Sequence, residues 1–351
     1  MYGNLIYQSI INSTIHKFRT GLSFQLDDYD ELLQSQVYKR RELVPGTFFE
    51  YTYTPNDQFG LVAGVRADDN SLYGSFVTPR LNMRYEPVKG TTIRFSAGKG
   101  QRTANVFAEN NSVFASARKL DLQMNPHVAG YGLLPEIAWN KGISLDQKFN
   151  LFEHTATLGF DYFRNDFQNQ VIVDLENPRL VQIYNLKGKS YSNSIQTELN
   201  MQPLDKLDIR LAYRYFQVFQ TYNGELLERP FIAKNRAFVS LDYATTNNWK
   251  FNYTITFNGK KRVTNTSANP SSLQLSSYSP SYTIMNAQVS KTFGKTHLND
   301  LYVGMENITD FFQQSPILSA DQPFGRYFDA ALIWGPTTGR MLYMGWRLKI
   351  K

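Results

Sequence analysis

The feature that most constrains this chain is an alternation of apolar and polar side chains that recurs along almost its whole length. In residues 249–258, the odd positions are Trp, Phe, Tyr, Ile and Phe, and the residues between them are Lys, Asn and Thr. Residues 207–216 and 344–350 repeat the pattern. Because alternate side chains of a β-strand point to opposite faces, this period of two predicts an all-β chain.

The predicted strands are long. They span roughly 10 to 13 residues, whereas strands of globular proteins usually span about 5 or 6 and a tilted strand crossing a bilayer needs about 9 to 11. Their polar faces carry charges, which a wide barrel with a wet lumen tolerates and a dry core does not. A β-propeller, the main alternative, would show an internal repeat, and the sequence shows none. We therefore expect a transmembrane antiparallel β-barrel.

Composition agrees with this prediction and excludes several other classes. The chain has 22 Tyr and 25 Phe, aromatic residues suited to strands and to membrane interfaces, and no apolar run long enough for a transmembrane helix. Its net charge of +7 is scattered along the strands rather than gathered in a patch, so we expect no nucleic-acid partner. The absence of cysteine excludes thiol catalysis and cysteine-based metal sites.

The predicted connections alternate between short and long. We count about 15 strands, and a barrel of the outer membrane has short periplasmic turns and long external loops. The short turns are predicted near 56–57, 87–90, 150, 203–206, 245–247 and 294–297. The long connections are predicted at 28–40, 100–134, 166–189, 222–231, 261–280 and 310–338, with a modest one at 68–75.

An odd strand count has a consequence for the ends of the chain. The first and last strands would lie parallel, although bacterial single-chain barrels have even strand numbers. The first 18 residues also lack the basic leader, apolar core and cleavage site of a signal peptide. The sequence therefore predicts a truncated chain that lacks the beginning of its barrel.

Several stretches resemble the TonB-dependent outer-membrane receptors, particularly those of Bacteroidetes-type bacteria. The resemblance extends from Tyr2 to the end of the chain, and the ordered set is more specific than any single piece. The matching stretches are VPGTFFEYTY, GLVAGVRADDNSLYGSFVTPRLNMRYEP, TTIRFSAGKGQRTANVFAENN, PEIAWNKGISLDQKF, LYVGMENITDFF and PFGRYFDAALIWGPTTGRMLYMGWRLKIK.

The resemblance implies a fold and a function. Such receptors combine an N-terminal plug domain with a 22-stranded barrel. By this resemblance, residues 1–351 are one partial barrel domain with about 15 of 22 strands and no plug. The implied function is import of a scarce ligand, such as a siderophore, cobalamin or a metal, across the outer membrane of a Gram-negative bacterium. The alternative is a passive pore or a non-functional truncated remnant.

The implied partners are outer-membrane lipid, an unidentified small ligand, and the TonB system through a plug that this chain does not contain. No cofactor is expected. No serine–histidine or aspartate–histidine set suggests catalysis, so we expect no enzyme.

The long connection after residue 100 is the stretch most typical of a binding site. One interpretation is that its polar side chains contact the ligand or the plug; the other, which we favour, is that they cap a short helix and pin the loop to the barrel wall. The candidate residues are Arg102, Thr103, Asn105, Glu109, Asn110 and Asn111.

A metal site is not expected. Met124 and His127 offer a thioether and an imidazole, which suit copper, but the four histidines never reach a ligand spacing such as HxxxH. Charged residues of the strands are expected to form ladders across the wall instead. The expected pairs are Asp161 with Arg164, and Asp208 and Asp242 with Arg210 and Arg214.

The alternation also assigns the two faces of the wall. Thr254 is predicted to face the lumen, and no helix longer than about two turns is expected. The residues predicted to face lipid are Ile209, Leu211, Phe251, Tyr253, Ile255, Val303 and Leu348.

Overall fold

The protein is an antiparallel meander of long strands that forms a curved wall. The computed structural model describes residues 1–294 and 298–349. Fifteen strands follow one another in chain order, each hydrogen-bonded to the next, and a sixteenth short strand, β14 (Glu225–Glu228), pairs with β13. The fifteen are β1 (Tyr2–Ile11), β2 (Ser13–Leu33), β3 (Gln36–Asn56), β4 (Phe59–Asn70), β5 (Gly74–Val88), β6 (Thr91–Arg102), β8 (Glu136–Leu151), β9 (His154–Asn169), β12 (Ser190–Leu204), β13 (Leu207–Tyr222), β15 (Asn235–Ala244), β16 (Trp249–Asn258), β17 (Tyr282–Phe293), β18 (Asn299–Glu306) and β19 (Met341–Leu348).

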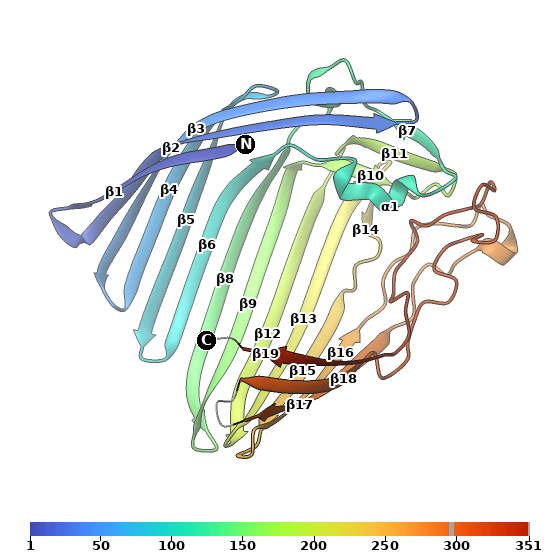
Figure 1. Cartoon of the computed structure of the whole chain (residues 1–351). Helices are drawn as coiled ribbons and strands as arrows, with labels where there is room; N and C mark the ends of the chain where they lie inside the picture. The colour runs from blue at the N-terminus through green and yellow to red at the C-terminus, as the bar shows by residue number, and fades with distance from the viewer. Residues whose placement is uncertain (295–297, 350–351) are drawn as a thin grey trace.

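This architecture confirms the predicted fold class. Figure 1 shows the wall curling from the blue N-terminal strands to the red C-terminal strands, with most of the irregular chain gathered at one end. Helical structure among the described residues is limited to α1 (Asn111–Phe114) and three short 3-10 turns. No helix in the described part of the chain has the length and apolarity to cross a membrane.

Most connections alternate between short and long as predicted, with the exception of residues 28–40. Among the described residues, six short turns lie at one end of the wall, including one at Asn12, which the sequence analysis did not identify. The longest connections lie at the other end, at 103–135, 170–189, 259–281 and 307–340. The predicted turn at 294–297 falls mostly outside the described residues.

The prediction of a long loop at 28–40 is wrong. Strands β2 and β3 continue to the pair Leu33↔Gln36 and are joined by a two-residue turn at Gln34 and Ser35. Both turn residues have positive φ, 47° and 67°, as a tight type I′ hairpin requires. The polar residues that suggested a loop are cross-strand partners, because acidic positions of β2 face basic positions of β3; Asp30 and Lys39 form an ion pair of 3.0 Å.

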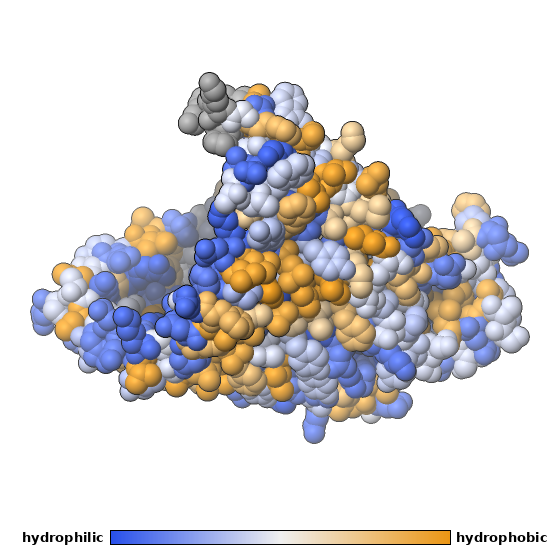
Figure 2. Space-filling view, turned by 90° about the horizontal axis from the view of Figure 1, so that it is seen from below, coloured by the Kyte–Doolittle hydropathy of each residue, from blue (hydrophilic) through white to orange (hydrophobic). Residues whose placement is uncertain are grey.

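The register shows which side chains share a face. Ile255 on β16 pairs with Val239 and Met285, and Val303 on β18 pairs with Val289 and Met344. The seven residues predicted to face lipid all lie on this outer face, as predicted. Figure 2, a view from below, shows broad apolar patches on the surface visible there.

The opposite, inner face carries the polar side chains and the contacts to the loops. Thr254 lies on this face and accepts a hydrogen bond from Asn286 Nδ2 at 3.2 Å. The expected lumenal pair of Asp161 and Arg164 is wrong. The two residues are three positions apart on β9 and therefore point to opposite faces, and Arg164 binds Asp166 on the outer face instead.

Candidate functional site

The long connections fold together into a layer that has its own core. We call the connections 103–135, 170–189, 223–234, 259–281 and 307–340 the loop layer. A small sheet of β7 (Lys119–Leu122), β10 (Val171–Asp174) and β11 (Leu180–Asn185) runs through it. Its buried apolar core contains Ala104, Val106, Val113, Leu133, Leu175, Val181, Ile183 and Ala331. The loop layer is therefore packed like a small globular domain rather than hanging free above the wall.

Arg118 joins three of these connections. Its side chain is 2% exposed, and its Nε lies 2.7 Å from Oδ2 of Asp329 in the last connection. Its Nη1 donates to the carbonyl oxygens of Leu175 and Asn177 at 2.9 and 2.8 Å. A buried charge is stable only when it is paired and hydrogen-bonded, so this arginine fixes the relative positions of the three connections.

Arg262 ties the connection 259–281 to the same layer. Its guanidinium forms a two-pronged ion pair with Glu176, with Nη1 2.9 Å from Oε2, and its Nε donates to the carbonyl of Glu228. Burial opposes the charge of Arg262, but the hydrogen bonds and charge of Glu176 outweigh it and raise its pKa. The layer is thus cross-linked by arginine–carboxylate pairs, of which the forked Arg262–Glu176 pair is strong and geometrically specific.

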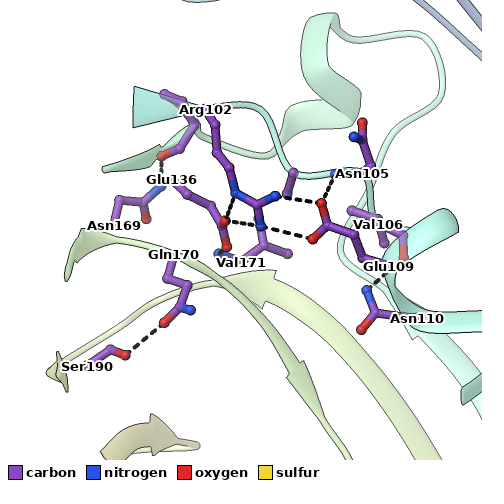
Figure 3. Close-up of polar contacts among 12 residues, drawn as sticks. Arg102, Asn105, Val106, Glu109, Asn110, Glu136, Asn169, Gln170, Val171 and Ser190 are labelled. Atoms are coloured by element: carbon purple, nitrogen blue, oxygen red, sulfur yellow. Dashed lines mark hydrogen bonds and ion pairs between the residues drawn. The ribbon is translucent and has the colours of Figure 1, made fainter. Parts of the chain in front are cut away.

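Arg102 lies at the point where β6 enters the loop layer. Its Nε donates to Oε2 of Glu136 at 2.8 Å, and its Nη1 and Nη2 donate to the two oxygens of Glu109 at 2.7 and 2.9 Å (Figure 3). Burial alone would raise the pKa of Glu109, but the hydrogen bonds and charge of Arg102 lower it below its usual value. Arg102 therefore holds the first turn of the connection against the start of β8.

Thr103 and Asn105 attach the connection to β3. The hydroxyl of Thr103 donates to Oε1 of Glu42 at 2.6 Å, and the side chain of Asn105 accepts a hydrogen bond from Arg40. Arg40 also donates to the carbonyl of Ala104 at 3.0 Å. These contacts pin the loop to the wall, as the favoured interpretation of these residues predicts.

The remaining candidates have different surroundings. Asn110 donates to the carbonyl of Val106 at 2.8 Å, a contact within the loop (Figure 3). Asn111 is exposed at the start of α1. Neither α1 nor the preceding 3-10 turn has a side-chain cap, so the expected helix-capping role is wrong for these residues.

Two polar cavities flank Arg102. The first, of about 490 Å³, lies against β1–β6 and is lined by Glu42, Asp68, Asn70, Thr103 and Asn105 among others. The second, of about 500 Å³, lies between the loop and β13 and is lined by Glu109, Asn110, Gln170, Gln220 and Tyr222 among others. Arg102 lines both. Five of the six candidate residues thus border one or both cavities, and Asn111 borders neither.

The chemistry of the layer offers no metal centre. Among the described residues, no group of three His, Cys, Asp or Glu side chains has a geometry that would hold a metal. Met124 packs against the apolar core of the loop layer, and His127 is exposed. His297, the fourth histidine, lies outside the described residues.

The sequence analysis missed the residues that organise the layer. Arg118, Glu176, Arg262 and Asp329 lie in irregular segments where periodicity gives no information, and up to 211 positions separate the paired residues. The only available signal was the presence of charged residues inside otherwise apolar stretches, as at Arg118 before KLDL.

Comparison with known proteins agrees with the fold. The chain is similar to a double mutant of the ferric enterobactin receptor PfeA from Pseudomonas aeruginosa (TM-score 0.73, 16% identity), covering 99% of this chain and 53% of that one. It is similar to the siderophore receptor PirA from Acinetobacter baumannii (TM-score 0.71, 15% identity), covering 99% and 54%. It is also similar to the copper transporter OprC (TM-score 0.70, 12% identity), covering 97% and 54%. At these identities the likeness is one of fold.

The chain spans about half the length of these solved structures. No curated protein matches the sequence at a significant level.

The sequence itself matches a family described as "TonB dependent receptor-like, beta-barrel" over residues 4–308. That family consists of receptors of the Gram-negative outer membrane and not of enzymes, which confirms the expected location and the absence of an enzymatic role. The alternating strands, the arrangement of turns and loops and this match lead to one conclusion: the chain belongs to the TonB-dependent receptor β-barrel family.

Proposed function

We propose that residues 1–351 are one partial barrel domain, the wall and external loops of an outer-membrane receptor that imports a scarce small ligand. The observation that carries this proposal is the loop layer: a cross-linked layer borders two polar cavities at the outer mouth of the wall. Concave sites with a few converging polar groups are typical of small-molecule binding.

We propose that the ligand is a scarce metal, a metal chelate such as a siderophore complex, cobalamin or a similar small molecule. PfeA and PirA are siderophore receptors and OprC is a copper transporter, and each shares this fold. Cavities of about 500 Å³ lie within the range of small-molecule binding sites.

We propose that TonB supplies the energy through a plug domain outside these 351 residues. The inner face of the wall carries many charged side chains, such as Arg66 and Asp68, which a polar plug can contact. Arg66 and Asp68 are themselves paired, with Nε 2.7 Å from Oδ2, so the wall presents an ordered polar surface.

We propose a positioning role for Arg102 and Glu109. Their hydrogen bonds are already satisfied by each other and by Glu136, so the loop that separates the two cavities is held in place before any ligand arrives. The ligand contacts then come from the cavity walls.

Uptake in cells tests the proposal. The gene, with its chromosomal upstream sequence, is expressed in a Gram-negative host that lacks its own receptors, and uptake of radiolabelled ferric chelates, copper and cobalamin is measured with and without TonB. We expect saturable uptake of one ligand that disappears without TonB. Equal uptake in both strains would establish a passive pore, and no uptake of any ligand would establish a non-functional remnant.

A further inference from the structure

Two arginines on the inner face lie directly opposite each other. Arg214 on β13 and Arg236 on β15 are register partners, and their side chains point to the same side of the wall. Directly opposed like charges repel each other across a sheet. Other inward-facing arginines are neutralised, as Arg210 is by Glu198 at 2.7 Å and Arg19 by Glu50 at 3.1 Å.

Arg214 and Arg236 have no such partner. Within the described residues, neither guanidinium forms an ion pair or a hydrogen bond. Arg214 makes a cation–π contact with the ring of Phe216, whose centroid lies 5.0 Å from its Cζ. The pairing of Asp208 and Asp242 with Arg210 and Arg214 predicted from the sequence is therefore wrong: Arg210 binds Glu198 instead, and Asp242 accepts hydrogen bonds from Ser240 and Asn252. The inner face of the wall therefore carries two adjacent positive charges that no carboxylate neutralises.

A cavity of about 740 Å³ opens in front of this pair. Both arginines line it together with Lys261, whose Nζ donates to the hydroxyl of Tyr282 at 3.2 Å and to the carbonyl of Trp334. None of its lining residues is acidic. A concave site lined by one sign of charge concentrates the electric field and attracts counter-ions.

The rest of the lining is aromatic. Phe216, Phe231, Tyr282 and Trp334 border the cavity. The ring of Tyr282 is held in place from behind, because it stacks on Phe311 at a centroid distance of 4.6 Å and an interplanar angle of 4°. Fixed aromatic rings provide faces on which a flat ligand stacks, and arginine forks bind carboxylate, sulfonate or phosphate groups through two parallel hydrogen bonds.

We propose that this cavity is a binding site for an anion that carries two or more negative charges on an aromatic body. That the bound anion is also the transported ligand rests on the proposed receptor function. Binding of the anion does not, because it depends on the cavity alone. It selects anionic aromatic ligands over neutral sugars and free metal cations. The site differs from the two cavities beside Arg102 in its basic lining, although it shares Phe231 and Ile232 with the second of them.

Equilibrium binding to the purified full chain in detergent tests this proposal. The probe is pyrenetetrasulfonate, a fluorescent aromatic tetra-anion, measured by fluorescence anisotropy. The variants are Arg214→Gln, Arg236→Gln and the double variant. The control is Arg210→Gln, which removes a positive charge four residues away on β13 that Glu198 already neutralises.

We expect the double variant to bind the probe at least about tenfold more weakly than the unaltered chain, and Arg210→Gln to bind it nearly as tightly. Binding should weaken as salt is added. Pyrenemethylammonium, a cation with the same ring system, should not bind. Tripolyphosphate, an anion without a ring, should bind more weakly than pyrenetetrasulfonate.

Thermal unfolding gives a second measurement that does not depend on transport. Without an anion, the double variant should melt at a higher temperature than the unaltered chain because the repulsion is gone. The probe should raise the melting temperature of the unaltered chain and leave that of the double variant unchanged. Equal probe binding by both proteins, or equal binding of the anionic and cationic pyrenes, would overturn the proposal. Equal affinity for tripolyphosphate would overturn its aromatic part. Failure of uptake in cells with these binding results intact would instead count against the proposed function.

Discussion

The wall and the loop layer solve the same problem of burying polar backbone in different ways. In the wall, the backbone N–H and C=O groups of each strand are hydrogen-bonded to the neighbouring strands, and lipid covers the apolar outer face. In the loop layer, irregular chain is held by a buried core and by arginine–carboxylate pairs such as Arg118 with Asp329. The wall therefore depends on a repeated local rule, whereas the loop layer depends on a few contacts between distant residues.

This difference predicts where single substitutions act. In the wall, the cost of a change depends on which face the side chain occupies and on its depth in the membrane. In the loop layer, it depends on whether the residue is one of the few that join separate connections. Three substitutions test this comparison, from the largest expected effect to the smallest.

Replacing Arg118 with Met should lower the free energy of local unfolding of the loop layer by about 3 to 5 kcal/mol, because it leaves the carboxylate of Asp329 buried without its partner. The wall should remain folded. Limited trypsin digestion of the folded protein in detergent measures the local opening, and cleavage at Lys119 should accelerate by about two to three orders of magnitude. Arg179→Met is the matched control, since Arg179 stacks on Tyr327 and donates only to the carbonyl of Arg326. Equal digestion of both variants would refute the role of Arg118.

Replacing Ile255 with Arg should cost about 2 to 4 kcal/mol, because this residue lies on the outer face near the middle of β16 and would place a charge in lipid. Thr254→Arg places the same charge one residue away on the inner face and should cost far less. Urea titration of folding into lipid vesicles measures both. Similar penalties at the two positions would contradict the assignment of faces.

The smallest effect is expected at Glu109. Its ion pair with Arg102 is half-exposed, so Glu109→Gln should cost about 1 kcal/mol or less. The pKa of Glu109 is lower in the folded protein than in the unfolded chain, so its stabilising effect is complete above the unfolded pKa of about 4.3 and is lost as the pH falls through the lower folded value. Hydrogen exchange of residues 103–114 between pH 7 and pH 3 measures this. The unaltered chain should lose protection of this segment over the acid range, and Glu109→Gln should show less change there.

The sequence contained most of the information about the wall. The strands, their order and the positions of most turns could be predicted because each depends on residues close together in the chain. The alternation of apolar and polar residues assigns the two faces of a strand, and the turn residues interrupt that alternation. The turn at Asn12 and residues 28–40 were exceptions, and residues 28–40 show the reason most clearly. There the pairing of acidic β2 with basic β3 stabilises a hairpin, and a pattern read along one strand does not include the partner strand.

The candidate site could be predicted only in part. Arg102, Thr103 and Asn105 were identified because they follow a strand end at the mouth of the wall, yet their partners Glu136, Glu42 and Arg40 were not. For the strand charges, the ladder of Arg210 with Glu198 follows from register. The position of Arg214 directly opposite Arg236 also follows from the register. It can be recognised only when the residue-by-residue pairing of β13 and β15 is known.

The sequence by itself determined the class of this protein: an all-β wall with membrane-length strands, one apolar and one polar face, and long loops at one end. An alternation with a period of two is a local property of each strand, so it can be recognised without knowing how that strand pairs with its neighbours. Only the tertiary structure decided that the long loops form one cross-linked layer and that uncompensated arginines face an aromatic cavity. Those features arise from contacts between residues as far apart as Arg118 and Asp329, and such contacts leave no periodic trace in the chain.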